Sequence, residues 1–327
     1  MDKIKIISII GPTASGKTSL SIAVAKKYNG EIVSADSMQI YKDMDIGTAK
    51  PTLEEMDGIK HYMMDFLPPS TNYSVADYVR DANSAIKEIL DKNKLPILVG
   101  GTGLYVDSLL NNVQFTEQKV DEQLRNKLNS KSDEELLLEL EKVDKESYDK
   151  LSKEINHKRI ARALEVYYLT GKPKSQVDKE AMMVESPYKP IKIGLYAEDR
   201  QFLYDRINQR VDIMVQQGVL EEAKNLMNSN LSLTAQKAIG YKEFFPYLNG
   251  EDTLKNCVET LKMNTRRYAK RQLTWFKRDK NIKWFDICKL NSEELIKKFY
   301  DIILLNFLGL KRNLLYFRFQ LIRQNLY

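Results

Sequence analysis

The segment Gly11–Thr18 has the residue types and the spacing of a phosphate-binding loop. Its sequence, GPTASGKT, fits the pattern G-x-x-x-x-G-K-[ST] at every position, with an apolar run before it and a helical pattern after it. The backbone N–H groups of such a loop, together with the positive end of the following helix, bind anions. Lys17 would add a positive charge, and the Thr18 hydroxyl could bind Mg²⁺. The ligand could be ATP, GTP or the pyrophosphate group of another molecule.

Two further polar side chains come directly after apolar runs. Asp36, in VSADSMQIY, could bind Mg²⁺ or act as a general base, but an Asp-Ser pair also commonly caps a turn, so both roles stay open. Thr102 is the polar side chain within Gly100–Gly103, where the glycines would let the backbone approach a ligand closely. Enzymes that hydrolyse nucleotides often have an aspartate at this point, and Val-Gly-Gly in its place argues against hydrolysis.

Arg206 and Arg210 are four residues apart, so on a helix they would share one face. Two cations directed at a phosphate group would stabilise a departing anion. The alternative is a solvated face on which these arginines pair with Asp205 and Asp212.

The segment 262–280, KMNTRRYAKRQLTWFKRDK, contains eight basic residues and one acidic residue, with aromatic residues between them. Basic side chains follow a phosphate backbone and aromatic rings stack on unpaired bases, so the segment is a candidate nucleic-acid surface. The alternative is a solvated face with Trp275 in the core. The segment 156–166, NHKRIARALEV, adds three basic residues at helical spacing. His61 and His157 show no metal-ligand spacing, and we assign neither a catalytic role.

These side chains need a scaffold, and the apolar runs predict one. Ile4–Ile10, Glu31–Ser34 and Pro96–Val99 have the pattern of buried parallel strands, and Ser74–Asp91 has that of an amphipathic helix between two of them. This alternation predicts an α/β fold with a P-loop-type parallel sheet flanked by helices. Ligands of such sheets bind beyond the carboxyl ends of the strands, which is where the loop, Asp36 and Thr102 would meet.

The pattern changes in the middle of the chain. Residues from about 117 to 185 are charged and helical, and we predict an inserted all-helical domain at 117–188. A strand at Ile191–Tyr196 would rejoin the sheet, followed by a helix that begins after Asp199 and stops at Gly218. The P-loop core domain would then comprise 1–116 and 189–300, with helices continuing to about 280. The apolar and basic tail, 301–327, could pack on the body, lie on a membrane surface or be poorly ordered, and packing is the default.

Composition limits the class of protein. The chain has 327 residues, which suggests about two domains, and a formal net charge of +6, which permits a nucleic-acid partner without requiring one. Two distant cysteines give no disulfide framework, the glycine loop lies too early for a signal peptide, and no apolar run is long enough to span a membrane. We therefore expect a cytoplasmic protein, a monomer with no obligate protein partner.

Several segments, in order along residues 4 to 285, closely resemble those of tRNA dimethylallyltransferases, also called tRNA isopentenyltransferases. They are GPTASGKT, VSADSMQIYKDMDIGTAKP, ILVGGTGLYVDSLL, KRIARALEVYYLTGKP, DRINQRVDIMVQQG, AIGYKEFFPYL and TRRYAKRQLTWF. The resemblance implies transfer of a dimethylallyl group from dimethylallyl pyrophosphate to N6 of the adenosine 3′ of the tRNA anticodon, with release of pyrophosphate. The loop would then hold a pyrophosphate, and no nucleotide would be hydrolysed.

The resemblance also implies roles for individual residues. Asp36 would be the general base, Thr102 and Lys17 would assist catalysis, and Thr18 would hold the Mg²⁺ cofactor. The pyrophosphate would contact Gly11, Pro12, Thr13, Ala14, Ser15, Gly16, Lys17, Thr18, Arg206 and Arg210. The tRNA anticodon stem-loop would contact Asp36, Ser37, Met38, Gln39, Thr102, Arg125, Lys158, Arg159, Arg162, Arg267, Lys270 and Arg271.

The chain departs from the family pattern at His157-Lys158, which replaces a more usual acidic or proline-containing approach, and it lacks the zinc finger of eukaryotic members, which favours the bacterial type. One alternative is an adenylate isopentenyltransferase acting on a free nucleotide, which would need neither the helical insertion nor the basic segment. The others are a P-loop kinase of a small metabolite and an RNA-binding protein without chemistry.

Overall fold

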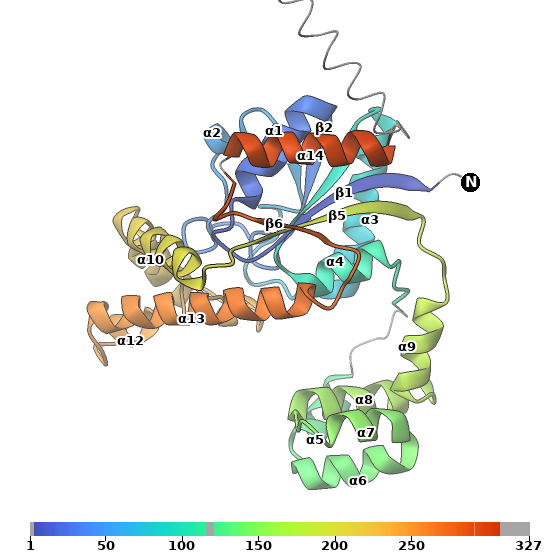
Figure 1. Cartoon of the computed structure of the whole chain (residues 1–327). Helices are drawn as coiled ribbons and strands as arrows, with labels where there is room; N and C mark the ends of the chain where they lie inside the picture. Colours follow the sequence, from blue (N-terminus) through green and yellow to red (C-terminus); the bar gives the residue numbers. More distant parts are fainter. Residues whose placement is uncertain (1–2, 116–120, 291, 308–327) are drawn as a thin grey trace, which may run out of the picture. The chain divides into compact units, whose positions relative to one another are not determined.

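The computed structural model describes residues 3–115, 121–290 and 292–307 (Figure 1). The chain divides into two compact units, of which the first comprises Met1–Leu110 and Tyr188–Tyr327 and the second comprises Asn111–Pro187. No described helix combines the length and the apolar character that crossing a membrane requires.

The first unit is built on a six-stranded, all-parallel sheet in the order β3-β2-β4-β1-β5-β6. In this sheet β1 is central, since Ile7 pairs with Ile97 on one side and with Ile191 on the other. The fold class predicted from the sequence is therefore confirmed. The strands are β1 (Ile4–Ile10), β2 (Gly30–Ala35), β3 (His61–Tyr62), β4 (Leu95–Gly100), β5 (Tyr188–Tyr196) and β6 (Lys283–Asp286).

Alternate residues of β1 pack on opposite faces of the sheet, as a buried strand requires. Ile7 and Ile9 contact the cluster formed with α1 (Lys17–Tyr28) and α14 (Ser292–Phe307). In Figure 1, α14 (red) lies beside α1, and the Tyr300 hydroxyl donates a hydrogen bond to the Ala23 carbonyl at 3.3 Å.

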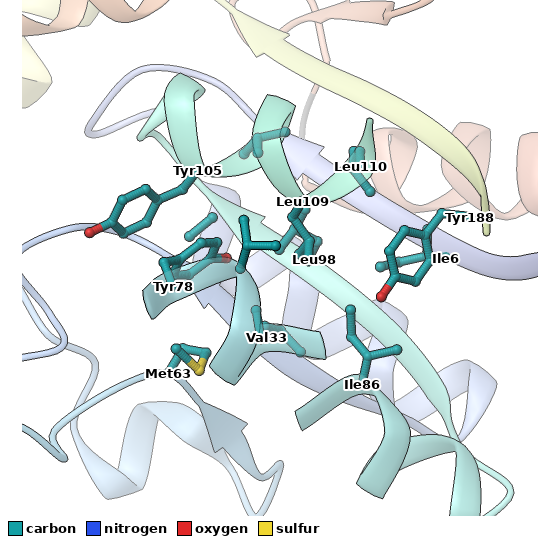
Figure 2. Close-up of a cluster of buried hydrophobic side chains, with 14 of the residues drawn as sticks. Ile6, Val33, Met63, Tyr78, Ile86, Leu98, Tyr105, Leu109, Leu110 and Tyr188 are labelled. Carbon is teal, nitrogen blue, oxygen red and sulfur yellow. The ribbon is translucent and has the colours of Figure 1, made fainter. Parts of the chain in front are cut away.

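The opposite face is covered by α3 (Val75–Asp91), α4 (Gly103–Leu110) and α13 (Leu254–Phe276). Figure 2 shows this cluster, in which the ring of Tyr78 stacks on that of Tyr105 with 4.0 Å between centroids. The helix predicted over Ser74–Asp91 is observed as α3, which begins one residue later because Ser74 is its N-cap and forms a reciprocal capping box with Asp77. Because all the strands are parallel, their carboxyl ends lie along one edge of the sheet.

A third cluster lies beside the sheet and holds the segment that follows β2. Ile40, Tyr41 and Met44 pack there against residues of α10 (Arg200–Gln216) and α11 (Val219–Met227). Asp199 caps α10 as expected, since its carboxylate accepts a hydrogen bond from the Gln201 N–H. The remaining short helices of the first unit are α2 (Leu53–Met56), the 3₁₀ helix η1 (Ala235–Lys237) and α12 (Phe245–Leu248).

Among its described residues, 111–115 and 121–187, the second unit contains helices and no strand, and the non-helical segments 111–115 and 183–187 form its two ends. Its core is formed by leucine, isoleucine and alanine side chains such as Leu136, Leu140 and Ile160. Glu165, which is 3% exposed, also brings a carboxylate into the interior of the unit. The helices are α5 (Glu122–Asn129), α6 (Asp133–Val143), α7 (Lys145–Leu151), α8 (His157–Thr170) and α9 (Lys174–Met182).

The second unit begins at Asn111, earlier than the expected boundary at 117. Residues between these positions bond within the unit, because the Gln114 N–H donates to the Ala181 carbonyl at 3.2 Å and the Asn112 amide donates to the Glu185 carbonyl at 3.4 Å.

The carboxyl-terminal part differs more from the expectation. Helices continue to Phe276, close to the expected 280, but β6 and α14 then follow, and the sequence analysis predicted neither. The boundary expected at 301 falls inside α14, where Ile303 is 1% exposed within the core cluster. The rest of the expected tail, 308–327, lies outside the described residues.

Candidate active site

A cavity of about 380 Å³ lies where the predicted loops of the first unit meet. It is lined by Thr13, Lys17 and Thr18 after β1, by Asp36–Gln39 after β2, and by Gly100 and Gly101 at the end of β4. The strand-end positions named from the sequence therefore surround one space, as expected for ligands of parallel sheets.

The loop Gly11–Thr18 has the backbone of an anion cradle. Gly11 has φ +152°, and a Cβ atom there would lie 2.7 Å from the Leu195 carbonyl oxygen, so this position requires glycine. Gly16 has φ 87° and precedes the first residue of α1. The Ser15 hydroxyl is buried and has no hydrogen-bond partner among the described residues. A buried hydroxyl of this kind fits a loop built to bind an oxyanion.

Lys17 faces the same cavity from the first turn of α1. Its ammonium donates a hydrogen bond to the Pro12 carbonyl at 2.6 Å. Burial, followed by the charge of Arg210, lowers the pKa of Lys17 from 10.5 to about 7, while Asp36 opposes this shift. An entering anion would bring negative charge beside the ammonium and favour its charged form.

Both predicted arginines of α10 contact the loop. Arg206 Nε donates to the Ala14 carbonyl at 2.9 Å, and Arg210 donates to the Thr13 hydroxyl at 3.3 Å while lining the cavity. Burial lowers the pKa of Arg210. The pairing with neighbouring acids is not found, since Asp205 accepts from Gln201 and Asp212 pairs with Lys262 at 2.8 Å, although Arg206 is exposed as the alternative expected.

Asp36 caps a turn and also faces the cavity. Its Oδ1 accepts hydrogen bonds from the N–H groups of Met38, at 2.9 Å, and Gln39, at 3.3 Å, so it does cap the turn. The carboxylate also lines the cavity, close enough to Lys17 to raise that lysine's pKa. The cap fixes the carboxylate's direction without removing it from the cavity.

Thr102 does not line the cavity itself but binds Ser37, which does. The Thr102 hydroxyl accepts the Ser37 N–H at 3.1 Å, and the Thr102 N–H donates to the Ala35 carbonyl at 3.1 Å. The glycines around it are explained by protein neighbours more than by a ligand. A Cβ atom at Gly100 would lie 2.2 Å from the Ala35 oxygen, and one at Gly103 would lie 2.2 Å from the Trp275 ring.

Sequence reasoning missed Gln272, although it joins two parts of the site. Its side chain is 5% exposed, accepts the Thr13 N–H at 2.9 Å and donates to the Gly101 carbonyl at 3.1 Å. The signal was its spacing, because Gln272 falls on the buried face of α13 with Leu261, Ala269 and Phe276. Tyr268, on the same helix, lines the cavity, and burial together with the nearby Asp36 charge raises its pKa to about 12.

From Lys262 onward, the basic residues of α13 divide into two sets. Lys262 and Arg266 are partly buried and bind Asp212 and Asn208, whereas Arg267, Lys270 and Arg271 are exposed, and Arg271 also lines the cavity. We call Arg267, Lys270 and Arg271 the basic stripe. It starts at the cavity and follows the exposed face of α13.

Trp275 takes the structural role that the sequence left as the alternative. Its indole N–H donates to the Asp107 carboxylate at 2.7 Å, its ring packs on the core cluster below the sheet, and the Arg278 guanidinium lies 4.0 Å from the ring centroid.

In the second unit, the predicted RNA contacts also divide. Arg125 and Arg162 both bind the buried Glu165 carboxylate, at 2.9 Å and 2.6 Å, so part of their charge compensates a buried negative charge within the unit. Lys158 and Arg159 are exposed at the start of α8. His157 has a structural partner, since its Nδ1 lies 2.7 Å from the Asp133 carboxylate.

The sequence also matches a known protein family. A sequence model described as IPP transferase matches residues 39–279, which is most of the chain. The chain belongs to the IPP transferase family. This confirms the family to which the sequence segments pointed.

The chain is similar over most of its length to several tRNA-modifying transferases. A tRNA dimethylallyltransferase of Thermoanaerobacter sp. (strain X514) is 48% identical over 302 residues, covering 90% of this chain and 96% of the relative. A tRNA isopentenylpyrophosphate transferase from Bacillus halodurans has a crystal structure that matches with a TM-score of 0.70 at 43% identity, covering 92% of this chain and 96% of that one. A eukaryotic dimethylallyltransferase acting on tRNA matches with a TM-score of 0.78 at 31% identity, covering 93% of this chain and 79% of that one.

Proposed function

We propose that this chain transfers a dimethylallyl group from dimethylallyl pyrophosphate to N6 of the adenosine 3′ of the anticodon in tRNA, releasing pyrophosphate. The observation that carries the proposal is one cavity that joins an oxyanion loop, a fixed carboxylate and the start of an exposed basic stripe. Family membership gives the class of reaction, and a tRNA substrate would place the chain in the cytoplasm.

The pyrophosphate end of the donor would lie in the loop. Its oxygens would accept hydrogen bonds from loop N–H groups and from the Ser15 hydroxyl, which lacks a described partner. Lys17 and Arg210 would neutralise the negative charge that grows on the leaving pyrophosphate as its bond to carbon breaks. Arg206 would keep the loop in place through its bond to Ala14.

Mg²⁺ fits this loop as an ion held mainly by the donor. Thr18 is exposed and lines the cavity, and the described residues contain no group of three or more His, Cys, Asp or Glu side chains able to hold a metal. Mg²⁺ commonly keeps several waters and binds substrate phosphates with few protein ligands. When bound by the Thr18 hydroxyl and the pyrophosphate, it would neutralise part of the phosphate charge.

Asp36 would be the general base. The adenine amine is a weak nucleophile because the ring withdraws its lone pair, so its proton must leave as the new C–N bond forms. Capping by Met38 and Gln39 holds the carboxylate in one orientation and would leave Oδ2 to accept that proton. The target base must leave its stack to reach a cavity of this kind. The cavity wall beside Asp36 is formed by Ser37, Met38 and Gln39, which would contact the target adenine. Thr102 would support Ser37 through its hydrogen bond to the Ser37 N–H.

The tRNA would bind through exposed cations. On the first unit these are the basic stripe of α13, and on the second unit they are Lys158 and Arg159, with the exposed edges of Arg125 and Arg162. Such contacts to phosphates supply affinity that depends on salt and little on sequence.

The test is to incubate the purified protein with Mg²⁺, dimethylallyl pyrophosphate and unmodified tRNA, then digest the RNA and detect prenylated adenosine by mass. Asp36→Asn keeps an oxygen for the cap but cannot take the proton, so we expect it to abolish product and leave tRNA binding intact. The control is Asp43→Asn, an exposed aspartate at φ 59°, where asparagine is tolerated.

Product from wild type and Asp43→Asn but not from Asp36→Asn would support the proposal.

Parallel tubes with AMP or ATP in place of tRNA address the alternatives. Product on the free nucleotide alone would indicate an adenylate isopentenyltransferase, and consumption of ATP would indicate a kinase. Binding of tRNA without any product would indicate a binding protein, and each of these three results would refute the proposal.

A further inference from the structure

We propose that Glu222 is a positioning residue that holds the subsites of both substrates in register, although it does not line the cavity. The inference rests on the proposed function for the identity of the substrates. Glu222 lies on α11, and it is not among the described residues that surround the cavity. It acts through the segment 45–49, which runs between α11 and the site.

The Glu222 carboxylate binds a turn of backbone with both oxygens. Oε1 accepts the N–H groups of Asp45, at 2.9 Å, and Gly47, at 3.4 Å, and Oε2 accepts the N–H of Ile46 at 2.9 Å. The Tyr241 hydroxyl also donates to Oε1. Hydrogen bonds to a charged acceptor are stronger than neutral ones, so this single side chain sets the path of three consecutive residues.

The next two residues of the segment contact both subsites. The carbonyls of Thr48 and Ala49 accept the Gln39 side-chain amide at 3.2 Å and 3.1 Å. The Ala49 carbonyl also accepts Arg210 at 3.3 Å. Gln39 belongs to the wall proposed to contact the adenosine, and Arg210 to the pyrophosphate site. The segment 45–49 is therefore a physical connection between the two.

The segment 45–49 has little room to move, because Gly47 packs closely against Tyr241 and Gly240. A Cβ atom at Gly47 would lie 2.5 Å from the Tyr241 ring, and one at Gly240 would lie 2.5 Å from the Gly47 carbonyl oxygen. Tyr241 is 2% exposed, and burial beside the Glu222 charge raises its pKa, so the phenol keeps its proton as a donor. A shift of Asp45–Gly47 would thus be passed on to Thr48 and Ala49.

Glu222→Gln tests this because it changes little in volume but replaces one acceptor oxygen by a donor NH₂ group, which would face backbone N–H groups. The matched control is Glu221→Gln, which changes the neighbouring, exposed glutamate of the same helix. Tyr241→Phe is a milder variant, since it removes one donor and keeps the ring against Gly47.

We expect Glu222→Gln to lower kcat/KM roughly 10- to 100-fold for both tRNA and dimethylallyl pyrophosphate, as small misplacements of substrate-binding groups do. Tyr241→Phe should change it in the same direction by less, and Glu221→Gln should stay within about twofold of wild type. In a Gln39→Ala background, Glu222→Gln should cost less for tRNA than it does alone, because its effect runs through Gln39. An unchanged kcat/KM, or full multiplication of the two losses, would overturn the proposal.

Hydrogen exchange of the substrate-free protein separates this inference from the proposed function. The amides of Asp45, Ile46 and Gly47 should exchange faster in Glu222→Gln than in wild type and in Glu221→Gln, whatever the enzyme's substrate. Unchanged exchange at these amides would refute the positioning role. A wild-type protein that makes no prenylated tRNA would instead refute the proposed function.

Discussion

Binding of a pyrophosphate group should draw a proton from solvent onto Lys17. In the free protein, burial and the charge of Arg210 hold the pKa of Lys17 at about 7. A bound pyrophosphate would place several negative charges beside the ammonium and raise this pKa, so binding and protonation favour each other. The affinity should therefore be greatest below pH 7 and fall as the pH rises above it.

The size of the effect follows from the pKa. At pH 8, one unit above a pKa of about 7, roughly nine tenths of the free protein carries neutral Lys17, so binding takes up roughly 0.9 proton per site. At pH 6 the uptake should be roughly 0.1 proton, since the lysine is already charged. Between these values the affinity should fall toward a limiting slope of about tenfold per pH unit. The value of kcat/KM for dimethylallyl pyrophosphate, which reports groups of the free enzyme, should decline in the same range.

Isothermal titration of pyrophosphate in two buffers of different ionisation enthalpy measures the proton uptake directly. Pyrophosphate itself exchanges protons, so the same titration with Lys17→Arg, which stays charged at these pH values, measures the ligand's share. The difference between the two proteins is the contribution of Lys17. Equal uptake by both at pH 8 would show that Lys17 is already protonated in the free protein, and the reasoning from its burial would be refuted.

Three further predictions concern parts of the molecule around the site. Gln272→Ala should lower the free energy of unfolding by about 1–3 kcal/mol and raise KM for dimethylallyl pyrophosphate, because the Thr13 N–H of the loop would lose its buried acceptor. Denaturant unfolding measures the first effect and initial rates measure the second. An unchanged KM would contradict the proposed link between Gln272 and the loop. Phe299→Ala should lower the free energy of unfolding by about 3–5 kcal/mol, since this α14 side chain is fully buried, and a decrease of less than about 1 kcal/mol would mean that α14 does not pack as described. Replacing Arg267 and Lys270 together by alanine should weaken tRNA binding and reduce the slope of log affinity against log salt by roughly one for each phosphate that these side chains neutralise, whereas Lys255→Ala, at the exposed start of α13, should leave the slope unchanged.

The parts of the fold that could be predicted carry their signal in neighbouring residues. The loop Gly11–Thr18 follows an unbroken apolar strand, Ser74 and Asp199 are capping residues directly before their helices, and β1 is observed at Ile4–Ile10 as expected. Each depends on contacts a few residues apart, which sequence patterns record well. The meeting of the strand ends then follows from the geometry of parallel sheets.

The parts that were missed depend on distant residues. β3 has two residues and β6 has four, which is too short for an alternating pattern of apolar and polar residues to be seen. Both are edge strands that form by pairing with β2 and β5, which lie far from them in the sequence. The Thr13 N–H donates to Gln272, which lies 259 positions along the chain, so the spacing of Gln272 on α13 indicates that it is buried but not which polar group it binds. Likewise, charge spacing alone could not show that Arg125 binds Glu165.

The place of β5 in the sheet has a consequence for how the chain folds during synthesis. β1 pairs along its length with β5, so Ile4 must meet Tyr188, and the chain between them is roughly 180 residues long. Closing so long a loop costs little extra stability, since each doubling of length adds only about 0.6 kcal/mol. The main effect is a delay: at the usual rate of translation, β5 is synthesised on the order of 10 to 40 s after β1, so one edge of β1 stays unpaired for that time. A sheet of β3, β2, β4 and β1 formed before then would have the apolar strand β1 at its edge, and exposed apolar edge strands favour aggregation.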